Sequence, residues 1–395
     1  MIYLDAASTA KYTNIDDIIV ETMTNAMKDS WTNPSSLYAS NVKKKIDECR
    51  ENIAKFINAK PDEIIFTSGA SESNSMAIKG WVEQTDFDNR EKDTLDVNLP
   101  YIFTTPIEHK SILSVLDSSE LLCFRHMCMV DNDGVVILDS LERLLKTYEG
   151  DDILVTIHMA NNEIGTIQPI KKISELVHKY GGVLHVDATQ ALSHIPIDVE
   201  ALGIDMLSAS GHKISPVLRG IGFLYKRNGI NIKPLIYGAQ ENGLRGGTEN
   251  TYGIIGLSKA LEYCDVGFEA IGKVRDKSSY FIAMLKSKFG CKVNGSENMR
   301  LPNNVNVTFQ QNISGENLLY LLDMADIKVS VSSACNSHEI KQSHVLTVIG
   351  LSEEEAMRTV RFTLPSDITY DELNTVVDEI GKALKILELN SNGDE

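Results

Sequence analysis

Short apolar runs that alternate with helical segments are the feature that most restricts how this chain of 395 residues can fold. The runs are rich in β-branched residues, and several are separated by stretches with the apolar spacing of an amphipathic helix. Such alternation predicts an α/β fold, with a mainly parallel seven-stranded sheet and helices on both faces. The predicted strands cover residues 64–67, 101–105, 121–130, 153–158, 183–187, 206–210 and 221–225.

Two helices of this first part are clearly marked. One is expected over residues 71–81, after Gly69. The other is expected over residues 170–180, where Gly181 and Gly182 follow in the position that a C-terminal cap glycine prefers. Residues 83–98 are polar and acidic without a period, so we expect an exposed excursion there.

The pattern changes after residue 248 to long amphipathic helices with fewer strands. This predicts a smaller α+β domain, with a boundary near residues 255–270. The expected helices are 252–264, 269–289, 315–324 and 370–387, and the expected strands are 304–309 and 358–364.

Charge and cysteine content exclude several classes of protein. A net charge of −17 disfavours binding to duplex nucleic acid, which requires a basic face. Neither a leader peptide nor an apolar run of membrane-spanning length is evident, so we expect a cytoplasmic protein that does not bind membranes. The six cysteines form no CxxC pair and no close Cys/His spacing, so we expect neither a disulfide framework nor a metal site.

A lysine and an aspartate follow two of the predicted strands. Lys213 lies in the sequence SGHK after the strand 206–210, and Asp187 ends the strand 183–187. In open α/β sheets, ligands bind beyond the carboxyl ends of strands. Such a pair is what a pyridoxal phosphate (PLP) site requires, because a lysine carries the cofactor and a carboxylate keeps the pyridine nitrogen protonated. A surface lysine and a helix-capping aspartate are the alternative for each residue alone.

Residues 68–73 (SGASES) lie where a strand passes into a helix. Free backbone N–H groups and the hydroxyl of Ser71 favour an anion there, such as a phosphate. A plain helix cap at Ser71 is the alternative. The sequence has no GxGxxG after a strand and no GxxxxGK[ST], so dinucleotide and P-loop sites have no support.

A series of further motifs occurs in order along almost the whole chain. They are 3–5 (YLD), 33–36 (NPSS), 63–79 (EIIFTSGASESNSMAIK), 108–109 (EH), 161–170 (NNEIGTIQPI), 185–190 (HVDATQ), 196–199 (PIDV), 210–213 (SGHK), 245–250 (RGGTEN), 332–335 (SSAC) and 361–362 (RF). Together they resemble the cysteine desulfurases of the NifS/IscS type, which are fold-type I PLP enzymes of the class V aminotransferase family.

The resemblance implies a large PLP-binding domain over residues 16–256. A small domain of residues 1–15 and 257–395 would carry a catalytic cysteine loop. The implied chain is a homodimer that acts on L-cysteine and passes sulfur to an acceptor protein, in iron–sulfur cluster assembly or in thiolation of tRNA or cofactors.

The resemblance also implies roles for individual residues. Lys213 would bind PLP and move the substrate α-proton, and His109 would stack on the ring as an acid/base group. Arg361 and Asn33 would bind the substrate carboxylate. The remaining cofactor contacts would be Asp187 to the pyridine nitrogen, Asn162 and Gln190 to the phenolic oxygen, Ala70, Ser71, Ser210 and His212 to the phosphate, and Thr248 to the phosphate of a partner subunit.

Cys335 is the residue that would make this PLP enzyme a sulfurtransferase. Its surroundings, residues 331–344 (VSSACNSHEIKQSH), are polar and rich in serine, which is typical of an exposed loop. A thiol there can ionise and attack the sulfur of bound cysteine, and a buried structural cysteine is the alternative. The length of the stretch matches the long-loop subgroup of the family. His338 and His344 form no metal motif, so we expect them to be loop or packing residues.

Four departures from the family pattern lie in loops. Ser332 replaces a glycine of SSGSAC, and Pro365 follows 361–364 where glycine is usual. Residues 238–241 (GAQE) are one residue shorter than the family motif GGGQE. Residues 213–222 are one residue longer than the corresponding stretch of the family pattern.

Three functions follow from these motifs. The first is a cysteine desulfurase that forms alanine and a Cys335 persulfide. The second is a selenocysteine or cysteine-sulfinate lyase, or another class V enzyme, without a need for Cys335. The third is a non-catalytic scaffold, which the retention of Lys213, Asp187, His109, Arg361 and Cys335 disfavours.

Overall fold

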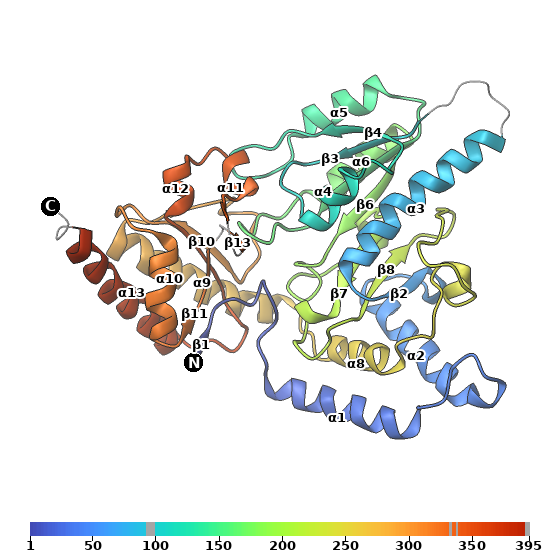
Figure 1. Ribbon diagram of the computed structural model, residues 1–395, viewed down its shortest axis with the longest axis horizontal. Coiled ribbons are helices and arrows are strands. Elements are labelled where there is room, and N and C mark those ends of the chain that lie inside the picture. Colours follow the sequence, from blue (N-terminus) through green and yellow to red (C-terminus); the bar gives the residue numbers. More distant parts are fainter. Residues whose placement is uncertain (92–98, 332–333, 337–338, 392–395) are drawn as a thin grey trace.

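The computed structural model describes residues 1–91, 99–331, 334–336 and 339–391, with the strands 334–336 and 339–341 described by their backbone alone. Two sheets dominate it, and each has its own set of helices (Figure 1). The predicted Ser332 and His338 lie outside the described residues.

The larger sheet has seven strands, as predicted. Its order is β2 (Ile64–Thr67), β8 (Gly222–Lys226), β7 (Met206–Ser210), β6 (Val183–Asp187), β5 (Ile153–His158), β3 (Tyr101–Thr104) and β4 (Phe124–Met127). The neighbours from β7 to β4 are parallel, whereas β8 is antiparallel to β2 and β7. Residues 211–221 connect β7 to β8, and this connection is too short for a parallel crossover with its helix.

Helices cover both faces of this sheet, because neighbouring side chains along its strands point to opposite faces. On one face, α3 (Ala70–Glu91) and α4 (Lys110–Leu116) pack on residues such as Ile65, Leu154 and Met206. The opposite face packs against α2 (Ser40–Phe56), α5 (Leu138–Thr147), α6 (Ile170–Lys179) and α8 (Thr251–Glu262). Helix α1 (Asn14–Asp29) packs on α8, and the short α7 (Val199–Leu202) follows β6.

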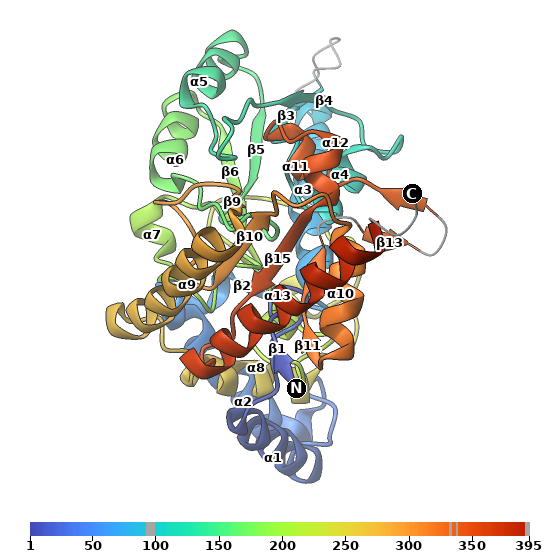
Figure 2. The same cartoon turned by 90° about the vertical axis from the view of Figure 1, so that its left-hand side faces the viewer.

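The smaller sheet has four antiparallel strands in the order β12 (Ser330–Val331), β15 (Thr359–Thr363), β10 (Asn304–Thr308) and β9 (Lys292–Val293). Helices α9 (Phe268–Phe289), α10 (Gly315–Met324) and α13 (Tyr370–Ser391) lie against it (Figure 2). The start of the chain joins this part, because β1 (Ile2–Tyr3) pairs in parallel with β11 (Ile327–Lys328). The short helices α11 (His344–Val348) and α12 (Glu353–Met357) precede β15.

The expected excursion from residue 83 is wrong for its first half. Helix α3 continues to Glu91, ten residues beyond the predicted end at Trp81. Side-chain pairs four residues apart support the extension, with Gln84 bound to Asp88 and Arg90 to Asp86. The polar composition hid a helix that carries charges on its exposed face. Residues 92–98 of the predicted excursion lie outside the described residues.

The other predicted elements agree within a few residues. For example, α6 ends at Lys179, and Gly181 follows with the positive φ of 73° that favours glycine. In the described part of the chain, every helix is too short or too polar to cross a membrane.

Candidate active site

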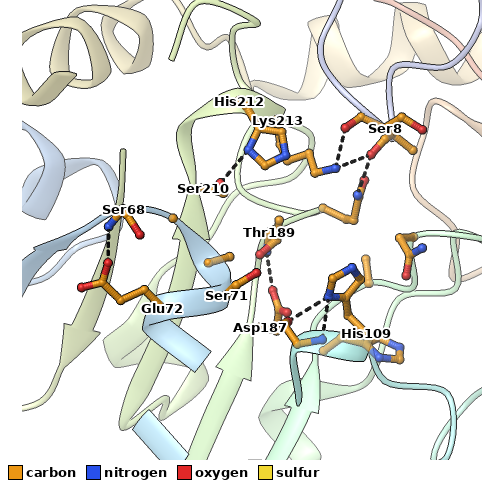
Figure 3. Close-up of a pocket in the computed structure, with 18 of the residues that line it drawn as sticks. Ser8, Ser68, Ser71, Glu72, His109, Asp187, Thr189, Ser210, His212 and Lys213 are labelled. Atoms are coloured by element: carbon orange, nitrogen blue, oxygen red, sulfur yellow. Dashed lines mark hydrogen bonds between the residues drawn. The ribbon is translucent and has the colours of Figure 1, made fainter. Parts of the chain in front are cut away.

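A cavity of about 450 Å³ lies beyond the carboxyl ends of β5, β6 and β7. Its wall combines these strand ends with the start of α3, the N-terminal segment, and one side chain of β15. Figure 3 shows many of these groups converging on one space. The lining residues are Ala7, Ser8, Ser68, Gly69, Ala70, Ser71, Glu72, His109, Ser111, His158, Ala160, Asn162, Asp187, Thr189, Gln190, Ser210, His212, Lys213 and Arg361.

The Lys213 amine projects into the cavity from a 3₁₀ helix, Gly211–Lys213, directly after β7. Its Nζ donates hydrogen bonds to the backbone oxygens of Ala7 (2.7 Å) and Ser8 (2.8 Å). Burial, with a smaller contribution from the nearby charge of Arg361, lowers the pKa of Lys213 to about 8. The amine is therefore far closer to its neutral, nucleophilic form at neutral pH than an ordinary lysine.

Asp187 is a buried carboxylate at the end of β6. One oxygen accepts a hydrogen bond from Asn74 Nδ2 (2.8 Å), and the other accepts one from the backbone N–H of Thr189 (2.9 Å). These bonds fix the carboxylate at the cavity wall. The sequence analysis missed Asn74, although a fully buried asparagine within the apolar stripe of α3 needs a partner.

The His109 ring caps the start of α4. Its Nδ1 accepts a hydrogen bond from the backbone N–H of Ser111 (3.1 Å), so the proton of the neutral ring is on Nε2. Burial lowers the pKa of His109, which favours the neutral ring. Ser111 Oγ lies 2.8 Å from Nδ1 and 2.9 Å from Asn74 Nδ2, so hydrogen bonds connect the ring to Asp187.

The start of α3 forms a cradle suited to an anion. Gly69 has a φ of +150°, and a Cβ atom there would lie 3.3 Å from Ser210 Oγ. Ala70 and Ser71 follow at the first positions of the helix, where backbone N–H groups and the helix dipole favour negative charge. Glu72 holds this turn in place by accepting bonds from Ser68 N (2.8 Å) and Arg245 Nε (2.9 Å).

Ser210 and His212 line the cavity beside this cradle. Ser210 Oγ lies 2.8 Å from His212 Nδ1. Burial, together with the charges of Lys213 and Arg219, lowers the pKa of His212 to about 4, so its ring is neutral at neutral pH. Gln190 lines the cavity as well, and its Nε2 donates to the backbone oxygen of Ala7 (3.0 Å).

Arg361 extends from β15 into the cavity opposite the sheet. Its guanidinium donates to Asp5 Oδ1 (2.7 Å), Ser8 Oγ (3.0 Å) and the backbone oxygen of Asn162 (3.0 Å). The buried Nε of Arg361 has no hydrogen-bond partner among the described residues. An oriented, incompletely satisfied guanidinium is suited to binding a carboxylate.

Comparison with known proteins assigns the chain to a family. The family model for aminotransferase class-V matches residues 2–376. The chain belongs to this family. A relative described as cysteine desulfurase IscS, from Dictyoglomus turgidum, is 40% identical over 395 residues, covering 98% of this chain and 95% of its own length. Methanosarcina thermophila has a cysteine desulfurase IscS that is 39% identical, with 98% and 92% covered.

Two solved structures have the same fold as this chain. A NifS-like protein matches with a TM-score of 0.86 and 32% identity, covering 98% of this chain and all of its own. The structure of SspA in complex with cysteine matches with a TM-score of 0.77 and 33% identity, covering 93% and 99% of the two chains. These matches confirm the predicted family and its fold.

Ten of the predicted site residues line this one cavity. They are Ala70, Ser71, His109, Asn162, Asp187, Gln190, Ser210, His212, Lys213 and Arg361.

Three of the predicted site residues are not among those that line this cavity. Asn33 is exposed in the turn after α1, where its Oδ1 accepts a hydrogen bond from Ser35 N (2.9 Å). Thr248 is exposed and lines a second cavity of about 200 Å³. Cys335 belongs to the hairpin of β13 (Ala334–Asn336) and β14 (Glu339–Lys341), opposite Ile340, and its side chain is outside the described atoms.

The loop departures have structural counterparts. Glu241 of the short GAQE sequence is buried, where it binds Arg50 (2.8 Å) and accepts a bond from Phe66 N (2.9 Å). Pro365 lies outside the main cavity, in the wall of a neighbouring one that also contacts Lys213.

Proposed function

We propose that this class V enzyme is a cysteine desulfurase that removes the sulfur of L-cysteine, releases L-alanine and holds the sulfur as a persulfide on Cys335. The observation that carries the proposal is one cavity with an amine of lowered pKa, Lys213, and an oriented guanidinium, Arg361, within a chain whose relatives are cysteine desulfurases. A reaction at the α-carbon of an amino acid needs both groups, because Arg361 would bind the carboxylate and Lys213 would move the α-proton.

The residues present fit pyridoxal 5'-phosphate. Lys213 would bind the aldehyde, Asp187 would face the pyridine nitrogen, and His109 would lie on the ring face. Gly69 leaves space at the start of α3, where Ala70 and Ser71 with Ser210 and His212 would bind the phosphate. Asn162 and Gln190 would contact the phenolic oxygen. When bound, PLP withdraws electrons from the α-carbon of the substrate.

The side chains around the substrate divide the remaining work. Arg361 binds the carboxylate and so orients the Cα–H bond. The Lys213 amine takes the α-proton and returns a proton to carbon. His109, neutral and protonated on Nε2, can donate a hydrogen bond from that nitrogen, and it would supply a proton only after it has itself become protonated. The Cys335 thiolate attacks the substrate sulfur, the C–S bond breaks, and the carbon that keeps the electron pair is protonated to give alanine.

We also propose a homodimer in which Thr248 reaches the phosphate site of the partner subunit. Thr248 is exposed and lies outside the cavity of its own chain, which supports a role across an interface. Large apolar side chains after α1 are also exposed, with Trp31 at 73%, Leu37 at 101% and Tyr38 at 79%. Such exposure is typical of an interface. Asn33, in the same turn, would approach the substrate carboxylate only in this assembly.

We propose two domains, a large one of residues 16–256 and a small one of residues 1–15 and 257–395. Separate apolar clusters support the division, since Leu4 packs with the small sheet and its helices. Helix α8 packs entirely on the large domain through Ile254, Leu257 and Leu261, which favours extending that domain to the end of α8. We further propose that the enzyme acts in the cytoplasm and delivers sulfur for iron–sulfur clusters or for thiolation.

The proposed function is tested with purified enzyme loaded with PLP. Incubation with L-cysteine and a thiol reductant is expected to release sulfide and alanine in equal amounts. A protein that consumes selenocysteine or cysteine sulfinate but leaves L-cysteine intact would be a different class V lyase. A protein that binds no PLP would contradict any catalytic role.

A further inference from the structure

The segment that carries Cys335 begins and ends beside the same arginine. At its start, Ser330 of β12 is the register partner of Arg361 on β15. At its end, Ser343 caps α11 and contacts the loop after β5, whose Asn162 accepts a hydrogen bond from Arg361. The cysteine segment therefore has both ends attached to the groups that surround the proposed carboxylate site.

The attachment at the end of the segment is a side-chain hydrogen bond. Ser343 Oγ donates to Glu163 Oε2 at 2.6 Å, and Ser343 is only 5% exposed. The same Oγ accepts from Leu346 N (3.2 Å), which caps α11. Glu163 has no place in the chemistry described above, yet its carboxyl is half-buried, and loss of solvent raises its pKa.

The loop that carries Glu163 is itself rigidly held. Its backbone N–H donates to Asn161 Oδ1 (2.9 Å). Its backbone oxygen accepts from the side-chain amides of Asn304 (3.0 Å) and Asn306 (3.2 Å), both on β10. Glu163 is thus a fixed point between the cavity and the small sheet.

A second bond restrains the first turn of α11. His344 Nε2 donates to the backbone oxygen of Glu108 (3.0 Å), the residue before His109. Ser343 and His344 therefore fasten this turn to two separate loops of the cavity wall.

We propose that Glu163 and Ser343 are positioning residues for sulfur transfer, because their hydrogen bond fixes the end of the Cys335 segment relative to Arg361. This proposal rests on the proposed function. The bond does not involve the groups that would bind the cofactor or take the α-proton. Its loss therefore affects the step that needs Cys335 and spares substrate binding. A purely structural bond would instead affect stability and all steps alike.

Four variants separate these possibilities. Glu163→Ala and Ser343→Ala each remove the bond, whereas Glu163→Gln keeps an oxygen that can accept from Ser343. Ser343→Ala also removes a helix cap, so the matched control is Ser352→Ala, which removes the equivalent cap of α12, made to Glu355 N (3.2 Å). All variants are studied as the full chain loaded with PLP.

The main measurement is a single turnover with L-cysteine. The change in visible absorption reports substrate binding, and mass spectrometry of the Cys335 peptide reports persulfide. In Glu163→Ala and Ser343→Ala, persulfide formation is expected to slow by at least about tenfold, with the absorption change within about twofold of wild type. Glu163→Gln and Ser352→Ala are expected to match wild type in both, and the Glu163→Ala/Ser343→Ala double variant to be no slower than either single variant.

A second measurement does not depend on activity. In the cofactor-free protein, alkylation of Cys335 by iodoacetamide is expected to quicken by a factor of about two to ten in the two alanine variants, which is the worth of one net hydrogen bond. Glu163→Gln and Ser352→Ala should leave this rate unchanged.

The outcomes that overturn the proposal are specific. Persulfide formation at the wild-type rate in both alanine variants, or equal slowing of the absorption change and of persulfide formation, would contradict it. If wild-type enzyme forms no persulfide from L-cysteine, the proposed function fails instead. The alkylation rates then decide whether Glu163 and Ser343 hold the segment.

Discussion

Lys213 and Arg361 are two basic side chains that line the same cavity, and their hydrogen-bond partners differ. Arg361 is paired with Asp5, whereas the hydrogen bonds of Lys213 within the described part of the chain go to neutral backbone oxygens, and burial lowers the pKa of Lys213 to about 8. Only a neutral amine can react with an aldehyde. We therefore expect the rate of PLP uptake by the cofactor-free protein to rise with pH and to level off above about 8.

The charge of Arg361 also lowers the pKa of Lys213. Its positive charge disfavours protonation of Lys213, so Arg361→Gln is expected to move the midpoint of PLP uptake to higher pH. Arg358→Gln is the control, because Arg358 does not line the cavity and bonds to the backbone oxygens of Glu354 and Gln310. A midpoint that stays in place in Arg361→Gln, or moves to lower pH, would show that the two groups do not interact.

Asp187 is expected to be needed for turnover and not for folding. Asp187→Ala removes the carboxylate that would keep the cofactor nitrogen protonated, and we expect a loss of turnover of at least about a hundredfold. Circular dichroism should remain that of wild type. The control is Asp198→Ala, which removes a helix-capping carboxylate that does not line the cavity. Activity near that of wild type in Asp187→Ala would mean that another group faces the nitrogen.

Among the elements, the proposed phosphate site at the start of α3 depends on how closely β8 approaches the turn before that helix. A Cβ atom on Gly222 would lie 2.4 Å from the backbone oxygen of Ala209 and 2.6 Å from Gly69 Cα. Gly222→Ala must therefore move one of these elements, at a cost of about 1–3 kcal/mol. We expect weaker PLP binding by equilibrium titration. Gly272→Ala in α9, where a Cβ meets nothing within 4 Å, should bind as wild type does, and unchanged affinity in Gly222→Ala would refute the cradle.

The strands were predictable because short apolar runs rich in β-branched residues favour buried β-strands. Residues 64–67, 153–158, 183–187 and 206–210 form the strands β2, β5, β6 and β7 with no change of boundary. The extension of α3 was not predictable from an apolar period. Its polar residues interact with one another four positions apart on the exposed face of the helix. Asn74 was missed for a related reason, since its partners come from two other elements.

At the scale of the whole molecule, the site combines segments that the sequence separates widely. Asp5 and Arg361 are paired although they are 356 positions apart in the sequence. Motifs placed most of the cavity residues, because strand ends and helix starts can be read locally. The backbone contacts of Lys213 with Ala7 and Ser8 could not be predicted, because they depend on where the segment between β1 and α1 lies relative to the end of β7.

The proposed dimer makes a prediction for mixed subunits. Lys213→Ala and Thr248→Ala inactivate different parts of a shared site, so mixing the two variants should restore part of the activity once the subunits exchange. Exchange is followed independently by mass spectrometry of differently tagged chains. Mixtures that exchange and stay as inactive as their parents would rule out the shared site.

Single-turnover persulfide analysis of Cys335→Ser with L-cysteine tests whether Cys335 receives the sulfur. In the proposed mechanism, substrate binding and α-proton removal depend on Lys213, His109 and Arg361, so the variant should still show the absorption change. It should form no protein persulfide, because a serine hydroxyl cannot replace a thiol whose ordinary pKa is about 8.5. Persulfide at the wild-type level in Cys335→Ser would show that another thiol, such as Cys123 or Cys128, receives the sulfur.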